Sequence, residues 1–201
     1  MEITTSKPIK TTNLKTKTMK KLLLLATFAV SYCVSAQDLF IQNYTDTILE
    51  YTIWKDNQAN IGGGCQPNLE SRDSVTGLSI LGPTISATMP REAYYLEDLT
   101  TTMTFSSAYP DTPLIDKWVL NADFVNPLVP PNPSLVAPSL ASQWSGIKFG
   151  VKNLSGIAIG GYYTMAKFCG QPIISSLGGY TNPAVNGTLF TAGGATWIVI
   201  Y

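Results

Sequence analysis

Hydrophobic and polar residues alternate along much of the chain after residue 37, which predicts β-strands. The clearest stretch is 147–152, where Ile, Phe and Val occupy every second position and Lys or Gly the positions between. Residues 99–106 and 118–124 alternate in the same way, whereas 48–54 and 197–201 are β-branched and aromatic runs typical of strands covered on both faces. No convincing stretch of helical periodicity follows residue 37.

Turn-forming residues separate these strands and predict hairpins. The expected hairpins join 39–42 to 48–54 through the turn 43–46, 147–152 to 157–168 through 153–156, and 189–191 to 196–201 through 192–195. Strands that recur at intervals of roughly 8–15 residues are typical of a sandwich or a barrel.

One proline-rich segment interrupts this pattern. Residues 126–138 contain five prolines, which remove ladder hydrogen bonds and favour an extended course. Cys65 precedes the segment and Cys169 follows it, so we interpret it as a surface crossover within one domain. The fold prediction is therefore an all-β, single-domain antiparallel β-sandwich over residues 37–201, either jelly-roll-like or Ig-like.

The N-terminal region has the pattern of a secretory signal. Met19-Lys20-Lys21 precede an apolar run at 22–34, and the small residues Ser35-Ala36 come before Gln37. Thirteen residues in a helix cover about 20 Å, which is too short for a stable membrane span. We interpret 19–36 as a signal peptide and 1–18 as a disordered upstream extension. Two alternatives remain open, an organelle transit segment and lipidation of Cys33.

Export implies an oxidising compartment, where disulfides persist. The predicted location is therefore secreted, extracellular or periplasmic, with association to the cell surface left open. Without residues 1–36 only two cysteines remain, and we expect Cys65 and Cys169 to form one intramolecular disulfide. Two buried free thiols are the alternative.

Charge and composition exclude several functions. Residues 37–201 carry seven Lys and Arg against twelve Asp and Glu, a net charge of −5, and the bases are scattered. Nucleic acid and anionic lipid are therefore not expected partners. The chain has no histidine, which excludes Ser-His-Asp and Cys-His catalysis and imidazole-bound zinc. Residues 62–65 lack the Lys-Ser/Thr of a phosphate loop, so no cofactor or metal is predicted.

Carboxylates are the remaining candidates for acid–base chemistry. A small glycoside hydrolase using Glu92 and Glu97 is the enzyme alternative, with Asp116 and Asp123 as further candidates. A weak calcium site at residues 56–60 with Asp111 and Asp116 is the metal alternative.

The aromatic residues favour binding over catalysis. Neighbouring strand residues face opposite ways, so one tyrosine of each pair, Tyr94-Tyr95 and Tyr162-Tyr163, is expected to face outward. Trp144 follows the proline segment and is the tryptophan expected to be exposed. The other three are assigned to the core: Trp54, Trp118 and Trp197.

Together these features predict a secreted, non-catalytic binding or surface-structural module, with a glycan or another cell-surface component as partner. Two short patterns, 46–48 and 73–75, resemble the Asp-Ser/Thr-aliphatic O-glycosylation acceptor of some secreted bacterial proteins. This resemblance implies Thr47 and Ser74 as modification sites. The ligand and the oligomeric state stay open at this point.

Overall fold

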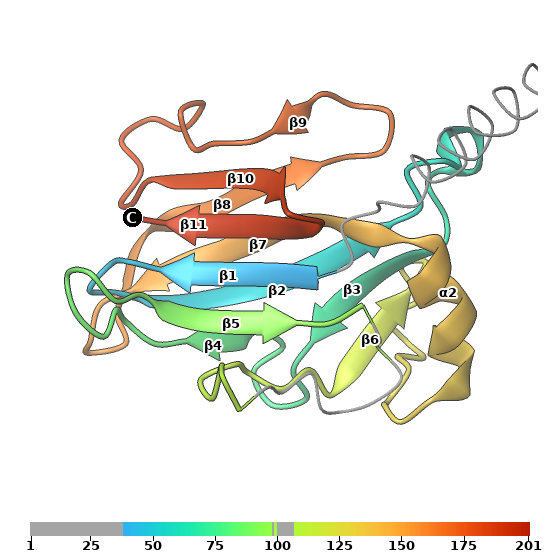
Figure 1. Cartoon of the computed structure of the whole chain (residues 1–201), viewed down its shortest axis with the longest axis horizontal. Coiled ribbons are helices and arrows are strands. Elements are labelled where there is room, and N and C mark those ends of the chain that lie inside the picture. Colours follow the sequence, from blue (N-terminus) through green and yellow to red (C-terminus); the bar gives the residue numbers. More distant parts are fainter. Residues whose placement is uncertain (1–37, 98, 100–106) are drawn as a thin grey trace, which may run out of the picture. The chain divides into compact units, whose positions relative to one another are not determined.

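The structure, a computed structural model, describes residues 38–97, 99 and 107–201. These residues are mostly β and build two sheets packed together, shown in Figure 1. The predicted all-β sandwich is confirmed. The expected upstream extension, the signal peptide and most of the predicted strand at 99–106 lie outside the described residues.

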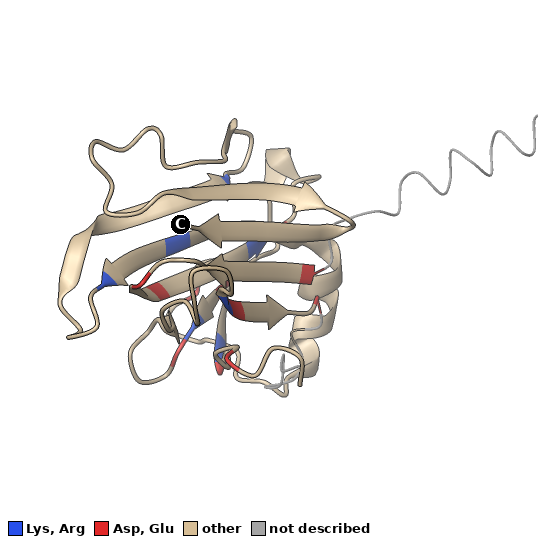
Figure 2. Ribbon diagram, turned by 60° about the vertical axis from the view of Figure 1, so that its left-hand side comes forward, with Lys and Arg blue, Asp and Glu red and all other residues tan. Residues whose placement is uncertain are grey.

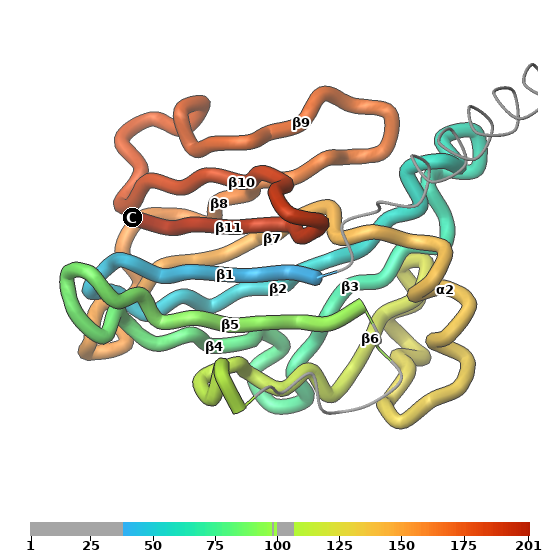
Figure 3. The backbone as a smooth tube through the Cα atoms, viewed as in Figure 1, coloured from blue at the N-terminus to red at the C-terminus, as the bar shows by residue number. Residues whose placement is uncertain are grey.

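The smaller sheet, called sheet A, has the strand order β10-β11-β1-β5. Its strands are β1 (Asp38–Asn43), β5 (Arg91–Tyr95), β10 (Gly187–Ala192) and β11 (Ala195–Ile200). β1 pairs with β11 in parallel, and the other two pairings are antiparallel. The expectation of an antiparallel sandwich thus has one exception, where the first described strand lies beside the last (Figure 3).

The larger sheet, called sheet B, has the order β6-β3-β2-β7-β8-β9, and β4 also pairs with β2. Its strands are β2 (Ile48–Asp56), β3 (Asn68–Arg72), β4 (Ser79–Leu81), β6 (Lys117–Leu120), β7 (Gln143–Lys152), β8 (Ala158–Lys167) and β9 (Ile173–Ile174). All pairings within the described part of this sheet are antiparallel, because hairpins and return connections join them.

Residues from the inner faces of both sheets form one core. Leu39 and Ile41 of β1 and Ile198 of β11 are fully buried from sheet A, and Tyr51 of β2 and Phe149 of β7 are fully buried from sheet B. The hydroxyls of Tyr51 and Tyr95 lie 2.7 Å apart, so a hydrogen bond joins the two sheets inside the core. Burial of apolar area contributes roughly 25 cal/mol per Å² and is the main stabilising term here.

Two of the three predicted hairpins are confirmed. The turn at 153–156 joins β7 to β8, and 192–195 joins β10 to β11. The first prediction is wrong, because the turn at 43–46 sends the chain from sheet A to sheet B and β1 does not pair with β2. The buried Asn43 fixes this crossing, since its side-chain amide donates to the carbonyls of Thr47 (2.7 Å) and Gly82 (2.8 Å).

Two further segments differ from expectation. The strand predicted at 118–124 ends at Leu120, because Asn121 and Ala122 adopt positive φ and form a turn. The proline segment was expected to be extended throughout but ends in two short helices, η2 (Pro133–Leu135) and α2 (Val136–Ala141). Asn132 begins η2 by accepting a bond from the Ser134 amide, and proline fits the first helical position.

The predicted disulfide between Cys65 and Cys169 is confirmed, with the two Cα atoms 5.6 Å apart. It connects Cys65, two residues after the end of the short helix η1 (Ile61–Gly63), to Cys169, two residues after the end of β8. Gly64 and Cys65 adopt positive φ, so the glycine-rich stretch makes a tight turn that leads into the disulfide.

Candidate functional site

An open pocket of about 480 Å³ lies on the outer face of sheet B. Outward-facing residues of three neighbouring strands form its floor, and Gly64, Phe168 and Cys169 also line it. The floor and wall residues discussed below are Thr52, Trp54 and Asp56 of β2, Glu70 and Arg72 of β3, and Lys148 of β7. We call this site the Trp54 pocket.

The indole of Trp54 lies across the neighbouring strand. A Cβ built on Gly146 of β7 would lie 2.5 Å from Cζ2 and 2.7 Å from Cε2 of Trp54. The ring therefore occupies the space where a side chain at residue 146 would stand, and only glycine permits this approach. The indole is thus packed against β7, and because Trp54 lines the pocket part of the ring borders the open space.

Phe168 extends the aromatic surface beside Trp54. The two rings are nearly parallel, with an interplanar angle of 24° and centroids 6.0 Å apart. At this distance the two rings are offset from each other, so the phenyl ring covers only part of the indole. Phe168 precedes Cys169, and the disulfide to Cys65 therefore holds this part of the pocket wall.

Polar groups surround the indole. Arg72 and Glu70 form an ion pair at 2.9 Å. The hydroxyl of Ser145 donates to Oδ2 of Asp56 at 2.9 Å. The indole is thus surrounded by hydrogen-bonding groups of both charges. Small-molecule sites have this general character, because their apolar surface contributes binding energy and a few polar groups orient the ligand.

Burial raises the pKa of the Asp56 carboxyl above its ordinary value, and the bond from Ser145 offsets part of this effect. A carboxyl whose folded-state pKa is raised contributes stability below its unfolded-state pKa, and that contribution is lost as the pH rises through the folded-state pKa.

We therefore expect Asp56→Asn to raise the urea midpoint at pH 7 and to leave it unchanged at pH 3. Asp123 is the control, because hydrogen bonds involving Asn126 lower the pKa of its carboxyl, so Asp123→Asn should lower the midpoint at pH 7. A lower midpoint for Asp56→Asn at pH 7 would contradict this assignment.

A second aromatic feature crosses the outer face of sheet A, and we call it the aromatic row. Its rings belong, in order, to Phe190 of β10, Trp197 of β11, Phe40 of β1, Tyr94 of β5 and Tyr109. The strand register places the first four side by side. The phenol of Tyr94 also donates to Asp38 at 3.0 Å. Burial and this carboxylate raise the pKa of Tyr94 to about 12, so the phenol stays protonated and remains a donor.

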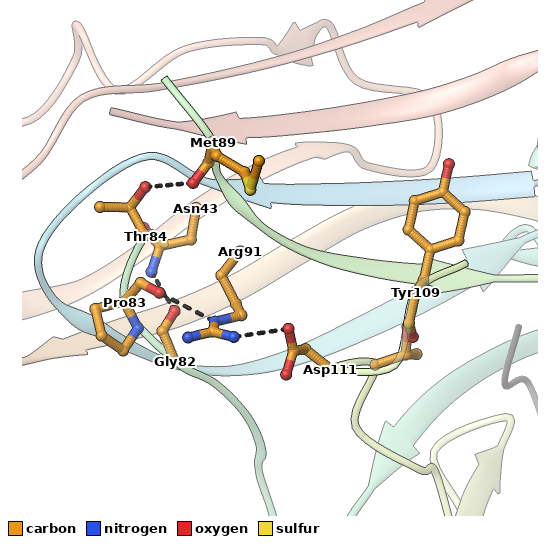
Figure 4. A network of polar contacts seen from close by, with 9 residues as sticks. Asn43, Gly82, Pro83, Thr84, Met89, Arg91, Tyr109 and Asp111 are labelled. Atoms are coloured by element: carbon orange, nitrogen blue, oxygen red, sulfur yellow. Dashed lines mark hydrogen bonds and ion pairs between the residues drawn. The ribbon is translucent and has the colours of Figure 1, made fainter. Parts of the chain in front are cut away.

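The rings of the aromatic row cover one another. Phe40 and Trp197 are stacked at 4.2 Å with an interplanar angle of 10°, so each hides a face of the other. Figure 4 shows Arg91, which pairs with Asp111 at 2.7 Å and so holds the segment that carries Tyr109. Because its central faces are already occupied, the row stabilises the sheet and is a poorer platform for a flat ligand than Trp54.

Three of the five predicted ligand-binding residues are buried. Trp144, expected to be exposed, is 5% exposed and packs against Trp118, with Nζ of Lys55 5.2 Å from its ring centroid. Tyr95 and Tyr163 are 0% and 4% exposed and belong to the core. Their burial leaves none of these three rings as a surface platform.

The alternation within the tyrosine pairs is nevertheless confirmed, because the partners Tyr94 and Tyr162 face outward. Tyr94 belongs to the aromatic row. Tyr162 is 57% exposed and lies on the outer face of sheet B, the same face as the Trp54 pocket.

The core assignment of the other tryptophans holds only for Trp118, which is 1% exposed. Trp54 and Trp197 are half-buried on the outer faces of the two sheets. The signal that identifies Trp54 is present in the sequence, because Glu50 and Thr52 alternate with the buried Leu49, Tyr51 and Ile53 and assign residue 54 to the wet face.

The two carboxylates proposed from sequence, Glu92 and Glu97, make different contacts and lie outside the pocket described above. Glu92 accepts a bond from Gln42 on the outer face of sheet A (2.6 Å), whereas the backbone carbonyl of Glu97 accepts bonds from Ser139 of α2 and from Lys55. Neither residue lines the Trp54 pocket. Among the described residues, no group of three or more Asp, Glu and Cys is arranged to hold a metal ion.

The two O-glycosylation patterns differ in accessibility. Thr47 is 7% exposed and its hydroxyl lies 2.5 Å from that of Thr45. Ser74 lies in an exposed turn, where its hydroxyl bonds to Asp116. O-glycosylation therefore stays a prediction for the exposed Ser74, and the buried Thr47 is a poor acceptor.

Lys and Arg as well as Asp and Glu lie scattered over the described part of the sandwich (Figure 2). Within residues 38–97, 99 and 107–201, no helix has the length and apolar character needed to cross a membrane. Comparison with models of known protein families, with curated proteins and with solved structures finds no match.

Proposed function

We propose that this protein is a secreted, non-catalytic module that binds carbohydrate in the Trp54 pocket. The observation that carries the proposal is the indole of Trp54, which packs against Gly146 and borders an open, polar-rimmed space. The apolar face of a sugar ring stacks on such a surface, while its hydroxyls bond to side chains like those of Glu70 and Asp56. The intramolecular disulfide supports an extracellular location.

Trp54→Ala should lower the affinity for a bound oligosaccharide by roughly tenfold or more, because it removes the stacking surface and leaves the polar rim. Binding is measured by calorimetry after a screen against a glycan array. Phe190→Ala is the matched control, since it removes an exposed ring from the other sheet. Equal losses in the two variants, or no saccharide binding by the intact protein, would refute the proposal.

A second candidate function, glycoside hydrolysis, is favoured by one observation. Glu70 pairs directly with Trp54, and Asp56 with Asn68, so Asp56 and Glu70 are diagonal neighbours on the same face. The Cα atoms of such neighbours are about 7–8 Å apart, which allows the two side chains to reach the carboxyl separation of roughly 6.5–9.5 Å found in inverting glycosidases. Asp56, whose carboxyl has a raised pKa, would act as the general acid. Glu70, which is paired with Arg72, would act as the general base.

The two functions are separated by one substitution. If the protein hydrolyses a bound saccharide, Asp56→Asn should abolish turnover and leave the saccharide bound. If it only binds, neither the intact protein nor this variant releases reducing ends. We favour binding because Asp56 already accepts a hydrogen bond from Ser145.

A further inference from the structure

Two aromatic rings lie over two glycines of the same strand on the outer face of sheet B. Trp54 covers Gly146, and a Cβ built on Gly150 would lie 3.0 Å from Cε1 of Tyr162. The two glycines are four residues apart in β7, which separates the ring positions by about 13 Å along the strand. This distance exceeds the size of one sugar ring, so only a ligand of several units could use both aromatic rings.

Lys148 lies between the two glycines. Its ammonium group is 5.4 Å from the ring centroid of Tyr162, and its side chain also lines the Trp54 pocket. The other cation of the pocket, Arg72, is paired with Glu70. No carboxylate forms an ion pair with Lys148 within the described residues, where the three ion pairs are those of Arg72, Arg91 and Lys152.

We propose that the ligand of the Trp54 pocket is an acidic oligosaccharide that lies along β7, with an anionic substituent on Lys148. This inference rests on the proposed function and adds the charge and the minimum length of the ligand. The anionic group is a carboxylate or a sulfate, since both accept charge-assisted hydrogen bonds from an ammonium group. The sugar units on either side of it would contact Trp54 and Tyr162.

The charge is tested with matched pairs of saccharides. These are a galacturonate hexasaccharide and its methyl ester, a hyaluronan oligosaccharide and its carboxyl-reduced form, and dextran sulfate and dextran. In at least one pair the acidic member should bind about tenfold more tightly, and the difference should shrink as salt is added. A preference for the acidic member only in the galacturonate or hyaluronan pair identifies the anionic group as a carboxylate. A preference only in the dextran sulfate pair identifies it as a sulfate.

Lys148→Gln should remove that preference, so that the acidic and neutral members of the pair bind with equal affinity. Lys152→Gln is the control, because Lys152 lies on the same face of β7 and is already paired with Glu50 at 2.5 Å. The control should retain the full preference for the acidic member.

The length is tested with Tyr162→Ala. This variant should weaken binding of the hexasaccharide severalfold and leave a disaccharide of the same sugar unaffected, because a disaccharide cannot extend from Trp54 to Tyr162. Equal losses for the two lengths would overturn the assignment along β7.

The remaining outcomes separate the inference from the proposed function. Trp54-dependent binding with equal affinity for acidic and neutral members overturns the inference and leaves the proposed function standing. An acidic preference that survives Lys148→Gln overturns the role of Lys148. Failure of every saccharide to bind overturns both.

Discussion

Replacing Cys65 and Cys169 together by serine should lower the free energy of unfolding by about 4–5 kcal/mol. The bridge joins residues 104 apart, and a long closed loop restricts the unfolded chain strongly. Domains of ordinary stability unfold at about 5–15 kcal/mol, so the loss is a large share of the total. We therefore expect the double variant to be partly unfolded at 37 °C.

Guanidinium unfolding of the double variant and of the wild type, with and without reductant, measures this effect. The double substitution avoids leaving one free thiol. Reduced wild type should unfold at the same midpoint as the variant, and saccharide binding should weaken in both because Gly64 and Cys169 line the pocket. A loss below about 1 kcal/mol would show that the bridge adds little to a sandwich already fixed by its core.

Trp197→Ala should lower the free energy of unfolding by about 3 kcal/mol. The indole stacks on Phe40 at 4.2 Å and lies parallel to Phe190 at 6.4 Å. Each aromatic pair contributes about 0.5–1.5 kcal/mol beyond the area it buries, and truncating a large aromatic residue in a core costs about 3–5 kcal/mol. Trp197 is only half-buried, which places the expected effect at the lower end.

Chemical unfolding of Trp197→Ala and Phe190→Ala tests the aromatic row. Phe190 lies at one end and has a single ring neighbour in the row, so its removal should cost about 1 kcal/mol. Saccharide binding should be intact in both variants under conditions where they are folded. Equal costs for the two substitutions, or loss of binding in the folded Trp197 variant, would contradict the structural role of the row.

Local patterns predicted most of the architecture. Alternation at 147–152 identified a strand because a two-residue period directly reflects one buried and one wet face. The turns at 153–156 and 192–195 predicted hairpins because neighbouring strands joined by a short turn pair with each other. Residues 37–201 contain two cysteines, which allow a single pairing, so the disulfide also followed from the sequence.

Pairings between segments that are distant in sequence could not be predicted from local patterns. The turn at 43–46 looks like a hairpin turn, but it leads from one sheet to the other because Asn43 binds the carbonyls of Thr47 and Gly82. Gly82 is distant in sequence, and no local pattern identifies it as a partner. The parallel pairing of β1 with β11 joins the two ends of the described chain and has the same limitation.

The candidate site was only partly predictable. The sequence identified outward-facing tyrosines but assigned Trp54 to the core, because its hydrophobicity was weighed above its position in the alternation of β2. The glycines of β7 are the missed signal. Glycine at outer positions of a strand marks a close approach by another group, and here those groups are Trp54 and Tyr162.

The most direct test of carbohydrate binding over Trp54 is an NMR titration of the ¹⁵N-labelled protein with the galacturonate hexasaccharide and with the neutral methyl ester. Each of the four tryptophans gives a separate indole N–H signal, and single substitutions assign them. The account predicts that the Trp54 signal shifts while those of Trp118, Trp144 and Trp197 stay in place. A saturable shift at Trp197 with Trp54 unmoved, or no shift at any indole, would contradict it.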